Sequence, residues 1–421
     1  MTKESVRASQ KQRLLLISEP NSYRLAPYIS AAKAMNLDVL VASDGKYSLT
    51  SEVADGLHID LSDMEQALNT ILEQARKTKF SGVIGSDDST VELASRVGHS
   101  LAVPHNPTNS ARLTRRKDLA RAHLAKSGCQ IPLHWLINLE DSLEQQVSQI
   151  DFPCVLKPLA LSASRGVIRA NDKQEFLTAC KRIAPMLKEA ANVDEKNHLL
   201  AESYIDGIEI AFEGFLENGK LTTLAIFDKP DPLTGPYFEE TIYVTPSKLS
   251  SWQQTLAIDQ IDKACRAYGL TTGPIHAELR IDQSSAWILE VAARSIGGDC
   301  ARSLDDDSFN LEELIVSLAI GKRYNLSLPV QARGVMMIPV PKRGILRRVE
   351  GLSEATRIPH IENIEIITRR GNELIPLPEG NQYPGFIFAR AKTSDEVVTA
   401  LREAHKKLNF VISPIITTRS T

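Results

Sequence analysis

The sequence has few cysteines, almost no net charge and no sign of a membrane-spanning segment. Its 421 residues include 5 cysteines, 22 glycines and 21 prolines, and the formal net charge is −3. These counts argue against collagen-like and low-complexity chains, and 43% hydrophobic residues argue against global disorder. Without a basic excess, the composition gives no support to nucleic-acid binding. The first apolar run covers only residues 14–17, far short of the roughly 20 residues of a membrane span.

The cysteines are odd in number, widely separated and never spaced as Cys-x-x-Cys. This pattern argues against a disulfide framework or a zinc site and favours buried, reduced thiols. The N-terminal residues are polar, with no hydrophobic segment behind them, so we expect a cytoplasmic protein. The five positions are Cys129, Cys154, Cys180, Cys265 and Cys300.

The length predicts about three domains. The first hundred residues alternate strand and helix patterns, which predicts a parallel sheet covered by helices. The turn after the first strand lacks Gly-x-Gly-x-x-Gly, so a bound dinucleotide is not indicated. The expected strands are 13–18, 38–43 and 80–86, and the expected helices are 25–36, 64–77 and 88–99.

The character of the sequence changes at about residue 113. A basic helix, 114–128, is followed by strand patterns with hairpin turns, which predict an α+β region with antiparallel sheets. From about residue 330 the sequence is again β-rich, and one helix, 394–408, is expected near its end with Ser394 as its N-cap.

Two glutamates fall opposite each other in a predicted hairpin. Residues 275–281 and 286–294 each alternate polar and apolar side chains, which is typical of strands. A turn about Ser284 would pair Glu278 with Glu290 at roughly 4.5–5.5 Å between Cβ atoms. Two such carboxylates could hold Mg²⁺, or each could be solvated or paired with a neighbouring arginine; the hairpin alone favours neither reading.

Three further segments carry weaker signals. Lys157 interrupts an apolar strand before the small-residue loop 161–166, a combination that suits phosphate but is also common on exposed edge strands. Lys117 lies in the basic helix, and basic helices are commonly solvated. Residues 201–209 predict a strand, a turn at Asp206-Gly207 and a second strand.

Taken in order, these motifs resemble the ATP-grasp superfamily of carboxylate–amine ligases. Residues 273–281, residues 289–298 and the C-terminal stretch are similar to bacterial L-amino-acid ligases of the bacilysin-synthetase kind. The resemblance implies a Rossmann-like pre-ATP-grasp domain at 1–112 and an ATP-grasp domain at 113–330. The latter would comprise a small lid subdomain at about 150–205 and a larger subdomain at about 206–330. A β-rich L-amino-acid-ligase domain is implied at 331–421.

The resemblance also implies roles for particular residues. Lys117 and Lys157 match the phosphate-binding lysines, and Ser162, Ser164, Arg165 and Gly166 match the loop that closes over the phosphates. Glu202, Tyr204 and Ile205 match the adenine site, and Glu209 matches the ribose ligand. Glu278 and Glu290 match the metal ligands, Arg294 matches the arginine beside the transferred phosphate, and His276 and Glu240 match residues that contact amino-acid substrates.

The implied reaction joins a carboxylate to an amine, those of two L-amino acids, through an acyl phosphate. It would use ATP and Mg²⁺, or Mn²⁺ in its place, and release ADP and phosphate. Two alternatives stay open: an ATP-grasp enzyme that activates bicarbonate or formate, and a nucleotide-binding regulator without catalysis. The implied partners are small-molecule carboxylates and amines. Relatives are often homodimers, but the sequence leaves the oligomeric state open.

Two glycines depart from the pattern of one relative. Gly297 and Gly298 stand where that relative has a bulky aromatic residue beyond the arginine. This difference suggests the hypothesis of a wider amino-acid pocket, for which Gly298→Trp would be the direct test.

Overall fold

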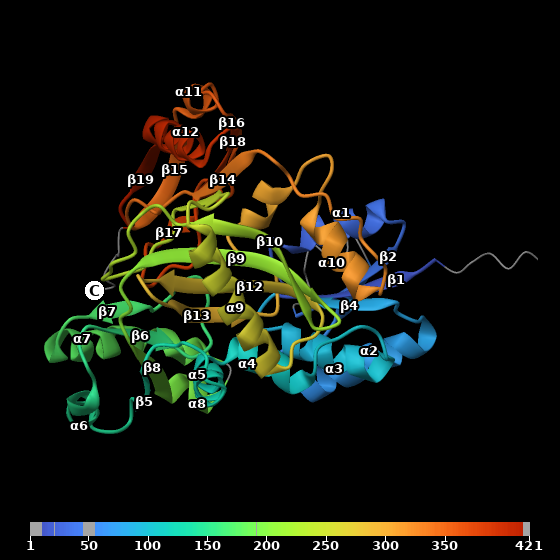
Figure 1. The fold of residues 1–421 in the computed structure, drawn as a ribbon, viewed down its shortest axis with the longest axis horizontal. Coiled ribbons are helices and arrows are strands. Elements are labelled where there is room, and N and C mark those ends of the chain that lie inside the picture. The colour runs from blue at the N-terminus through green and yellow to red at the C-terminus, as the bar shows by residue number, and fades with distance from the viewer. Residues whose placement is uncertain (1–10, 21, 45–54, 191, 416–421) are drawn as a thin grey trace, which may run out of the picture.

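The structure, a computed structural model, describes residues 11–20, 22–44, 55–190 and 192–415. Within this part, the chain forms a parallel sheet, a small antiparallel sheet, a large antiparallel sheet and a three-stranded sheet. Figure 1 shows the N-terminal sheet on one side of the large sheet, with the small sheet below it and the C-terminal elements above.

The N-terminal sheet is parallel, with strand order β3-β2-β1-β4. Alternate residues of β1 face opposite sides: Leu14 and Leu16 pack with α1 and α10, whereas Leu15 and Ile17 pack with α2 and α3. The predicted parallel sheet between helices is confirmed. Its elements are β1 (Arg13–Ser18), α1 (Leu25–Ala34), β2 (Asp38–Ser43), β3 (Asp55–His58), α2 (Met64–Lys77), β4 (Gly82–Gly85), α3 (Val91–Leu101) and, from later in the chain, α10 (Leu311–Ala319).

The predicted basic helix is two helices, α4 (Thr108–Arg115) and α5 (Lys117–Lys126). Arg116 between them has an extended backbone, and its guanidinium binds Asp118 and Asp194. The break frees the Lys117 N–H to donate to the Leu159 carbonyl at 3.1 Å. The correction matters for the site, because it fixes Lys117 beside the segment that follows Lys157.

The small sheet is antiparallel, with strand order β5-β8-β6-β7, and it packs against α7. Helix α7 begins at an Asp172 cap, whose side chain accepts from the Glu175 N–H. The elements here are β5 (His134–Asn138), α6 (Leu143–Gln146), β6 (Cys154–Pro158), β7 (Ile168–Ala170), α7 (Lys173–Ile183), α8 (Val193–Asn197) and β8 (His198–Ser203), with short 3₁₀ helices at Val147–Gln149 and Met186–Glu189.

The large sheet has eight antiparallel strands in the order β13-β12-β9-β10-β11-β14-β18-β16. Helix α9 covers β12 and β13, and a capping box of Ser250 and Gln253 starts it. The strands are β9 (Ile208–Glu217), β10 (Lys220–Asp228), β11 (Ile242–Thr245), β12 (Gly273–Ile281), β13 (Ala286–Ala292), β14 (Ala332–Met337), β16 (Ile361–Ile366) and β18 (Gly385–Ala391). Helix α9 (Ser251–Tyr268) lies between β11 and β12, and a 3₁₀ helix at Cys300–Leu304 follows β13.

The C-terminal region continues the large sheet. Strand β14 pairs with β11, so β14, β18 and β16 extend it beyond residue 330. A separate sheet has the order β17-β15-β19. The remaining elements are β15 (Gly344–Glu350), α11 (Leu352–Ala355), β17 (Glu373–Leu374), α12 (Ser394–Lys407) and β19 (Asn409–Ser413).

The predicted Ser394 cap is wrong by one residue. Thr393 caps α12 in a capping box with Glu396, and Ser394 is the first helical residue. Its hydroxyl donates instead to the Pro246 carbonyl at 2.7 Å. The hydroxyl of Ser394, which the local sequence predicts as the N-cap, is therefore used in a tertiary contact instead.

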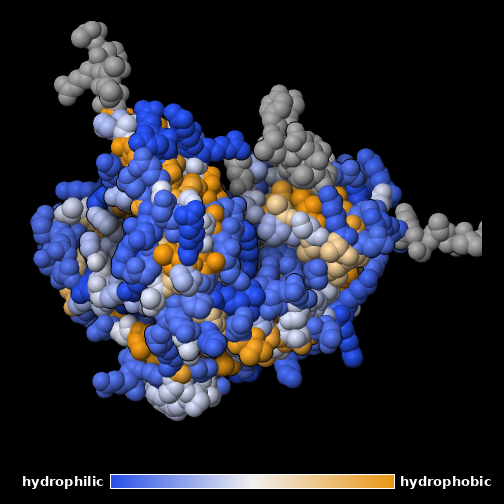
Figure 2. Space-filling model, turned by 90° about the horizontal axis from the view of Figure 1, so that it is seen from above, coloured by the Kyte–Doolittle hydropathy of each residue, from blue (hydrophilic) through white to orange (hydrophobic). Residues whose placement is uncertain are grey.

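All five cysteines are buried and free, as the sequence predicts. Among the described helices, none combines the length and the apolar character needed to cross a membrane. Seen from above, the surface is mainly hydrophilic, and its hydrophobic side chains form several separate patches (Figure 2).

The turn between β8 and β9 requires glycine. Gly207 has φ of +126°, and a Cβ there would lie 2.4 Å from the Ile281 carbonyl oxygen. Gly219 also has a positive φ, +77°, but a Cβ would meet nothing within 4 Å. We expect Gly219→Ala to cost about 1–2 kcal/mol from backbone strain alone, and Gly207→Ala to cost clearly more. Equal shifts of the two thermal unfolding midpoints would contradict the clash at Gly207.

Candidate active site

A cavity of about 720 Å³ opens between the N-terminal sheet, the small sheet and the large sheet. All of the predicted site residues line it except Gly166, whose neighbours Arg165 and Val167 do. The lining residues from that set are Lys117, Lys157, Ser162, Ser164, Arg165, Glu202, Tyr204, Ile205, Glu209, Glu240, His276, Glu278, Glu290 and Arg294. Residues more than 170 positions apart in the sequence therefore meet at one place.

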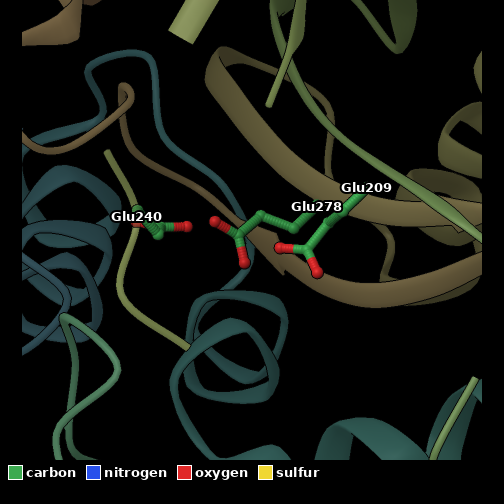
Figure 3. Close-up of side chains that lie close together, drawn as sticks. All are labelled: Glu209, Glu240 and Glu278. Atoms are coloured by element: carbon green, nitrogen blue, oxygen red, sulfur yellow. The ribbon is translucent and has the colours of Figure 1, made fainter. Parts of the chain in front are cut away.

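Three carboxylates of this cavity point toward one another from different segments. Figure 3 shows the side chains of Glu209, Glu240 and Glu278, whose nearest oxygens lie within 4.8 Å of one another. The ammonium group of Lys229 binds all three, at 2.9 Å from Glu209 and 3.0 Å from Glu278. Burial alone would lower the pKa of Lys229, but the carboxylates raise it well above its usual value. The cluster therefore already holds one cation, the lysine itself.

The predicted pairing of Glu278 with Glu290 is confirmed by the register of β12 and β13. Glu290 lies 3.6 Å from the Lys117 Nζ, and both glutamate side chains are partly exposed to the cavity. Two carboxylates on adjacent strands supply hard oxygen donors, which suit Mg²⁺ when phosphates and water complete its coordination. The residues present therefore fit a Mg²⁺ ion held by Glu278 and Glu290.

Glu202 is 1% exposed and bound by two cations. Its carboxylate accepts from Arg121 at 2.5 Å and lies 2.7 Å from the Lys157 Nζ. Burial would raise the pKa of Glu202, but Arg121 and then Lys157 outweigh it and lower the pKa to about 2. The structure thus places Lys157 and Glu202 in one ion pair at the cavity wall.

The predicted phosphate loop, residues 161–166, has a tightly turned backbone. Ala163, Ser164 and Gly166 all have positive φ angles. Lys117 reaches the start of the loop, where its Nζ donates to the Leu161 carbonyl at 3.1 Å. A Cβ on Gly166 would lie 2.8 Å from the Pro158 ring, so this position needs glycine. Loop and lysine together form a concave, polar end of the cavity.

Arg280 organises the segment expected to bind adenine and ribose. Its guanidinium donates to Glu209 at 2.9 Å and to the Ile205 carbonyl at 2.7 Å. The same group lies 4.9 Å from the centre of the Tyr204 ring, and Arg169 lies 4.0 Å from it. The predicted roles of Tyr204, Ile205 and Glu209 stay predictions.

His276 lies between two glutamates. Its Nδ1 is 3.1 Å from the Phe212 carbonyl and 3.5 Å from Glu213, and its Nε2 is 3.9 Å from Glu278. Burial would lower the pKa of His276, but the two carboxylates raise it to about 9. The imidazole is therefore held mainly as a cation, and its predicted contact with a substrate stays a prediction.

Arg294 is fixed by the N-terminal region, which the sequence analysis left out of the site. Its Nε donates to Asp88 at 2.7 Å, and Arg24 donates to the carbonyls of Ser295 and Ile296, both at 2.9 Å. Asp88 follows β4 and Arg24 follows β1, and the carboxyl ends of parallel strands commonly carry ligand-binding residues. The signal that could have found Asp88 and Arg24 in the sequence is their position shortly after two predicted parallel strands.

Gly297 and Gly298 line the cavity, so the wider pocket stays a hypothesis, but a side chain at position 298 would meet a neighbour. Gly298 has φ of +60°, and a Cβ there would lie 2.2 Å from the Met337 Sδ. Met337 thus fills the region that a side chain at 298 would enter. Gly298→Trp would strain the backbone and clash with Met337, so it does not test pocket width.

The lowered pKa of Glu202 predicts a loss of stability in acid. The carboxylate stabilises the folded state above pH 4.5, its unfolded value, and this contribution disappears as the pH falls from 4.5 toward 2. The difference between 4.5 and about 2 corresponds to roughly 3 kcal/mol. Glu202→Gln is expected to be less stable at pH 7 and to change less between pH 5 and 3. Parallel curves of unfolding midpoint against pH would contradict the ion pair.

Two family models match the chain: an ATP-grasp domain at residues 150–303 and an L-amino acid ligase C-terminal domain at 336–413. The chain is 22% identical over 250 residues to alanine–anticapsin ligase of Bacillus subtilis, covering 55% of this chain and 52% of that one. It thus spans about half the length of that relative. An uncharacterized protein of Sinorhizobium fredii is 21% identical over 413 residues, which make up 97% of this chain and 84% of that protein.

The fold is similar to that of solved structures. An L-amino acid ligase from Bacillus licheniformis matches with a TM-score of 0.84 and 24% identity, covering 96% of this chain and 99% of that one. This likeness confirms the predicted ATP-grasp fold. The two domain matches support an ADP-forming ligase. The chain combines an ATP-grasp domain with the C-terminal domain of L-amino acid ligases, as its resemblance to that group implies.

Proposed function

We propose that the protein is an ATP-dependent carboxylate–amine ligase that joins two L-amino acids. The observation that carries the proposal is the convergence of three cationic side chains with the carboxylate pair of β12 and β13 in one cavity. The cations are Lys117, Lys157 and Arg294. Alanine–anticapsin ligase and L-amino acid ligase, named for amino-acid substrates, support the substrate class.

The proposed chemistry explains why the site needs so much positive charge. A carboxylate is a poor electrophile, and transfer of the γ-phosphate to it gives an acyl phosphate with a good leaving group. ADP is left after this transfer. The amine then attacks the acyl carbon and loses a proton as the amide bond forms, and phosphate leaves. Both reactants of the first step are anions, so the protein must hold them together by positioning and charge stabilisation.

Each part of the cavity has a proposed task. Lys117, Lys157 and the phosphate loop would bind the phosphates of ATP. Glu278 and Glu290 would hold Mg²⁺, which supplies positive charge to the phosphates when bound. Arg294, fixed by Asp88, would face the transferred phosphate. Glu240 and His276 would contact the amino-acid substrates.

Other expectations stay predictions as well. These are the division at residues 112 and 330, the adenine and ribose contacts, the cytoplasmic location and a homodimer. The test below also distinguishes the two alternatives: an enzyme that activates bicarbonate or formate, and a regulator without catalysis.

The direct test measures MgATP-dependent phosphate release over a grid of paired L-amino acids, with mass detection of products. We expect release that requires a particular pair and a product lighter than the pair by one water. Release that requires bicarbonate or formate instead would replace the proposal with the first alternative. ATP binding without release under any mixture would favour the regulator.

Glu290→Ala tests the carboxylate pair. We expect kcat to fall by about 10²–10³, because one preorganised charge partner of the transition state is lost. Glu217→Ala is the matched control, since Glu217 is an exposed glutamate at the end of β9 in the same sheet. Near-full activity of Glu290→Ala, measured as phosphate release at saturating MgATP, would contradict the metal assignment.

A further inference from the structure

The phosphate loop is attached to the C-terminal region by a short loop that joins β17 to β18. This connection, residues 375–384, is called the latch loop below. The Pro378 carbonyl accepts from the Gly166 N–H at 2.9 Å, and the Glu379 carbonyl accepts from the Arg165 Nε at 3.1 Å. Two consecutive residues of the latch loop therefore bind two consecutive residues of the phosphate loop.

The side chain of Glu379 adds a third connection. Its carboxylate accepts two hydrogen bonds from Arg182 of α7, at 2.7 and 3.1 Å. A bidentate pair of this kind fixes the relative orientation of the guanidinium and the carboxylate as well as the distance between them. The Arg182 guanidinium also lies 5.0 Å from the centre of the Tyr237 ring, which limits its freedom. Arg182 thus holds Glu379 from the helix that packs under the small sheet.

The latch loop is tightly turned, and its backbone leaves no space for a side chain at Gly380. The Gly380 N–H donates to the Pro376 carbonyl at 2.9 Å, and a Cβ on Gly380 would lie 1.8 Å from the Ile375 carbonyl oxygen. The next residues, Asn381, Gln382 and Tyr383, line the cavity. One compact loop therefore contacts the phosphate loop with one part and the cavity with the next.

We propose that Glu379 is a positioning residue that holds the phosphate loop over the cavity: its carboxylate binds Arg182 of α7, and this fixes the backbone carbonyls of Pro378 and Glu379 that bind Gly166 and Arg165. This proposal depends on the proposed function at one point only: residues 161–166 are taken to bind phosphate. The carboxylate touches no reacting atom; it acts by limiting how far the loop and α7 move away from the C-terminal region. Lids of this kind must open and close for turnover, so partly exposed contacts are suitable to hold them.

The first test measures amide hydrogen exchange in residues 160–168 of the full chain without nucleotide. The Gly166 N–H is a direct reporter, because it donates to the latch loop. Glu379→Gln keeps the size of the side chain and removes its charge, and we expect about fivefold faster exchange there, the upper range for an exposed ion pair. Glu373→Gln is the control, since Glu373 forms a similar exposed pair with Arg343 at 2.9 Å nearby. Unchanged exchange in Glu379→Gln would overturn the proposal.

A charge exchange separates positioning from a general loss of stability. Arg182→Glu and Glu379→Arg should each speed the exchange of residues 160–168, and the double variant should restore it most of the way. A double variant that exchanges as fast as either single variant would contradict a direct role for the pair.

Kinetics give a second readout if the ligase activity is established. Glu379→Gln should raise KM for ATP about fivefold and leave kcat within about twofold, because closure is weakened while the reacting groups are intact. A fall in kcat with unchanged KM would overturn the positioning role. If no amino-acid pair gives turnover, the proposed function fails, but the exchange measurements still decide whether Glu379 holds the loop.

Discussion

The site depends on the pairing of buried charges. Lys229, 8% exposed, lies just after β10 and binds three carboxylates from three segments of the chain. Without this ammonium, the carboxylates would repel one another, and their negative charges would be buried without a compensating partner. An uncompensated buried charge strongly destabilises the folded state. Lys229 therefore makes it possible to gather acidic side chains where nucleotide and metal are proposed to bind. Glu278 and Glu290, on adjacent strands, are the pair proposed to hold a second cation.

The N-terminal sheet completes the site although it supplies none of the predicted ligands. Arg294 reaches the cavity from the end of β13, and Asp88, after β4, binds its guanidinium. Arg24, after β1, holds the carbonyls that follow Arg294. An arginine on an irregular segment has many rotamers; Asp88 limits those of Arg294, and Arg24 fixes the backbone that follows it. The position of the cation beside the proposed phosphate site is thus set by strands that lie more than 200 residues earlier.

What the sequence could predict follows from the range of the interactions. The strand alternation of residues 275–294 predicted the pairing of Glu278 with Glu290, because register in a hairpin is local. Lys229 and Asp88 were missed because their partners lie on other segments, 11 to 206 residues away, and no local pattern distinguishes them from solvated residues. The break at Arg116 was missed for the same reason, since Asp194 holds the guanidinium from 78 residues away. Family resemblance supplied the remaining candidates, whose placement in one cavity needed the structure.

The continuity of the large sheet explains how the C-terminal region can influence the phosphate loop. Strand β11 pairs with β14, so the strands that carry Glu209 and Glu278 belong to the same sheet as β18. The latch loop leads directly into β18 and is therefore anchored to that sheet. The phosphate loop, in contrast, belongs to the small sheet, which shares no strand with the large one. The contact between the two loops therefore joins the small sheet to the large one. It acts together with other links, such as the Arg169 N–H that donates to the Pro236 carbonyl at 2.9 Å, to fix the phosphate end of the cavity relative to the carboxylates.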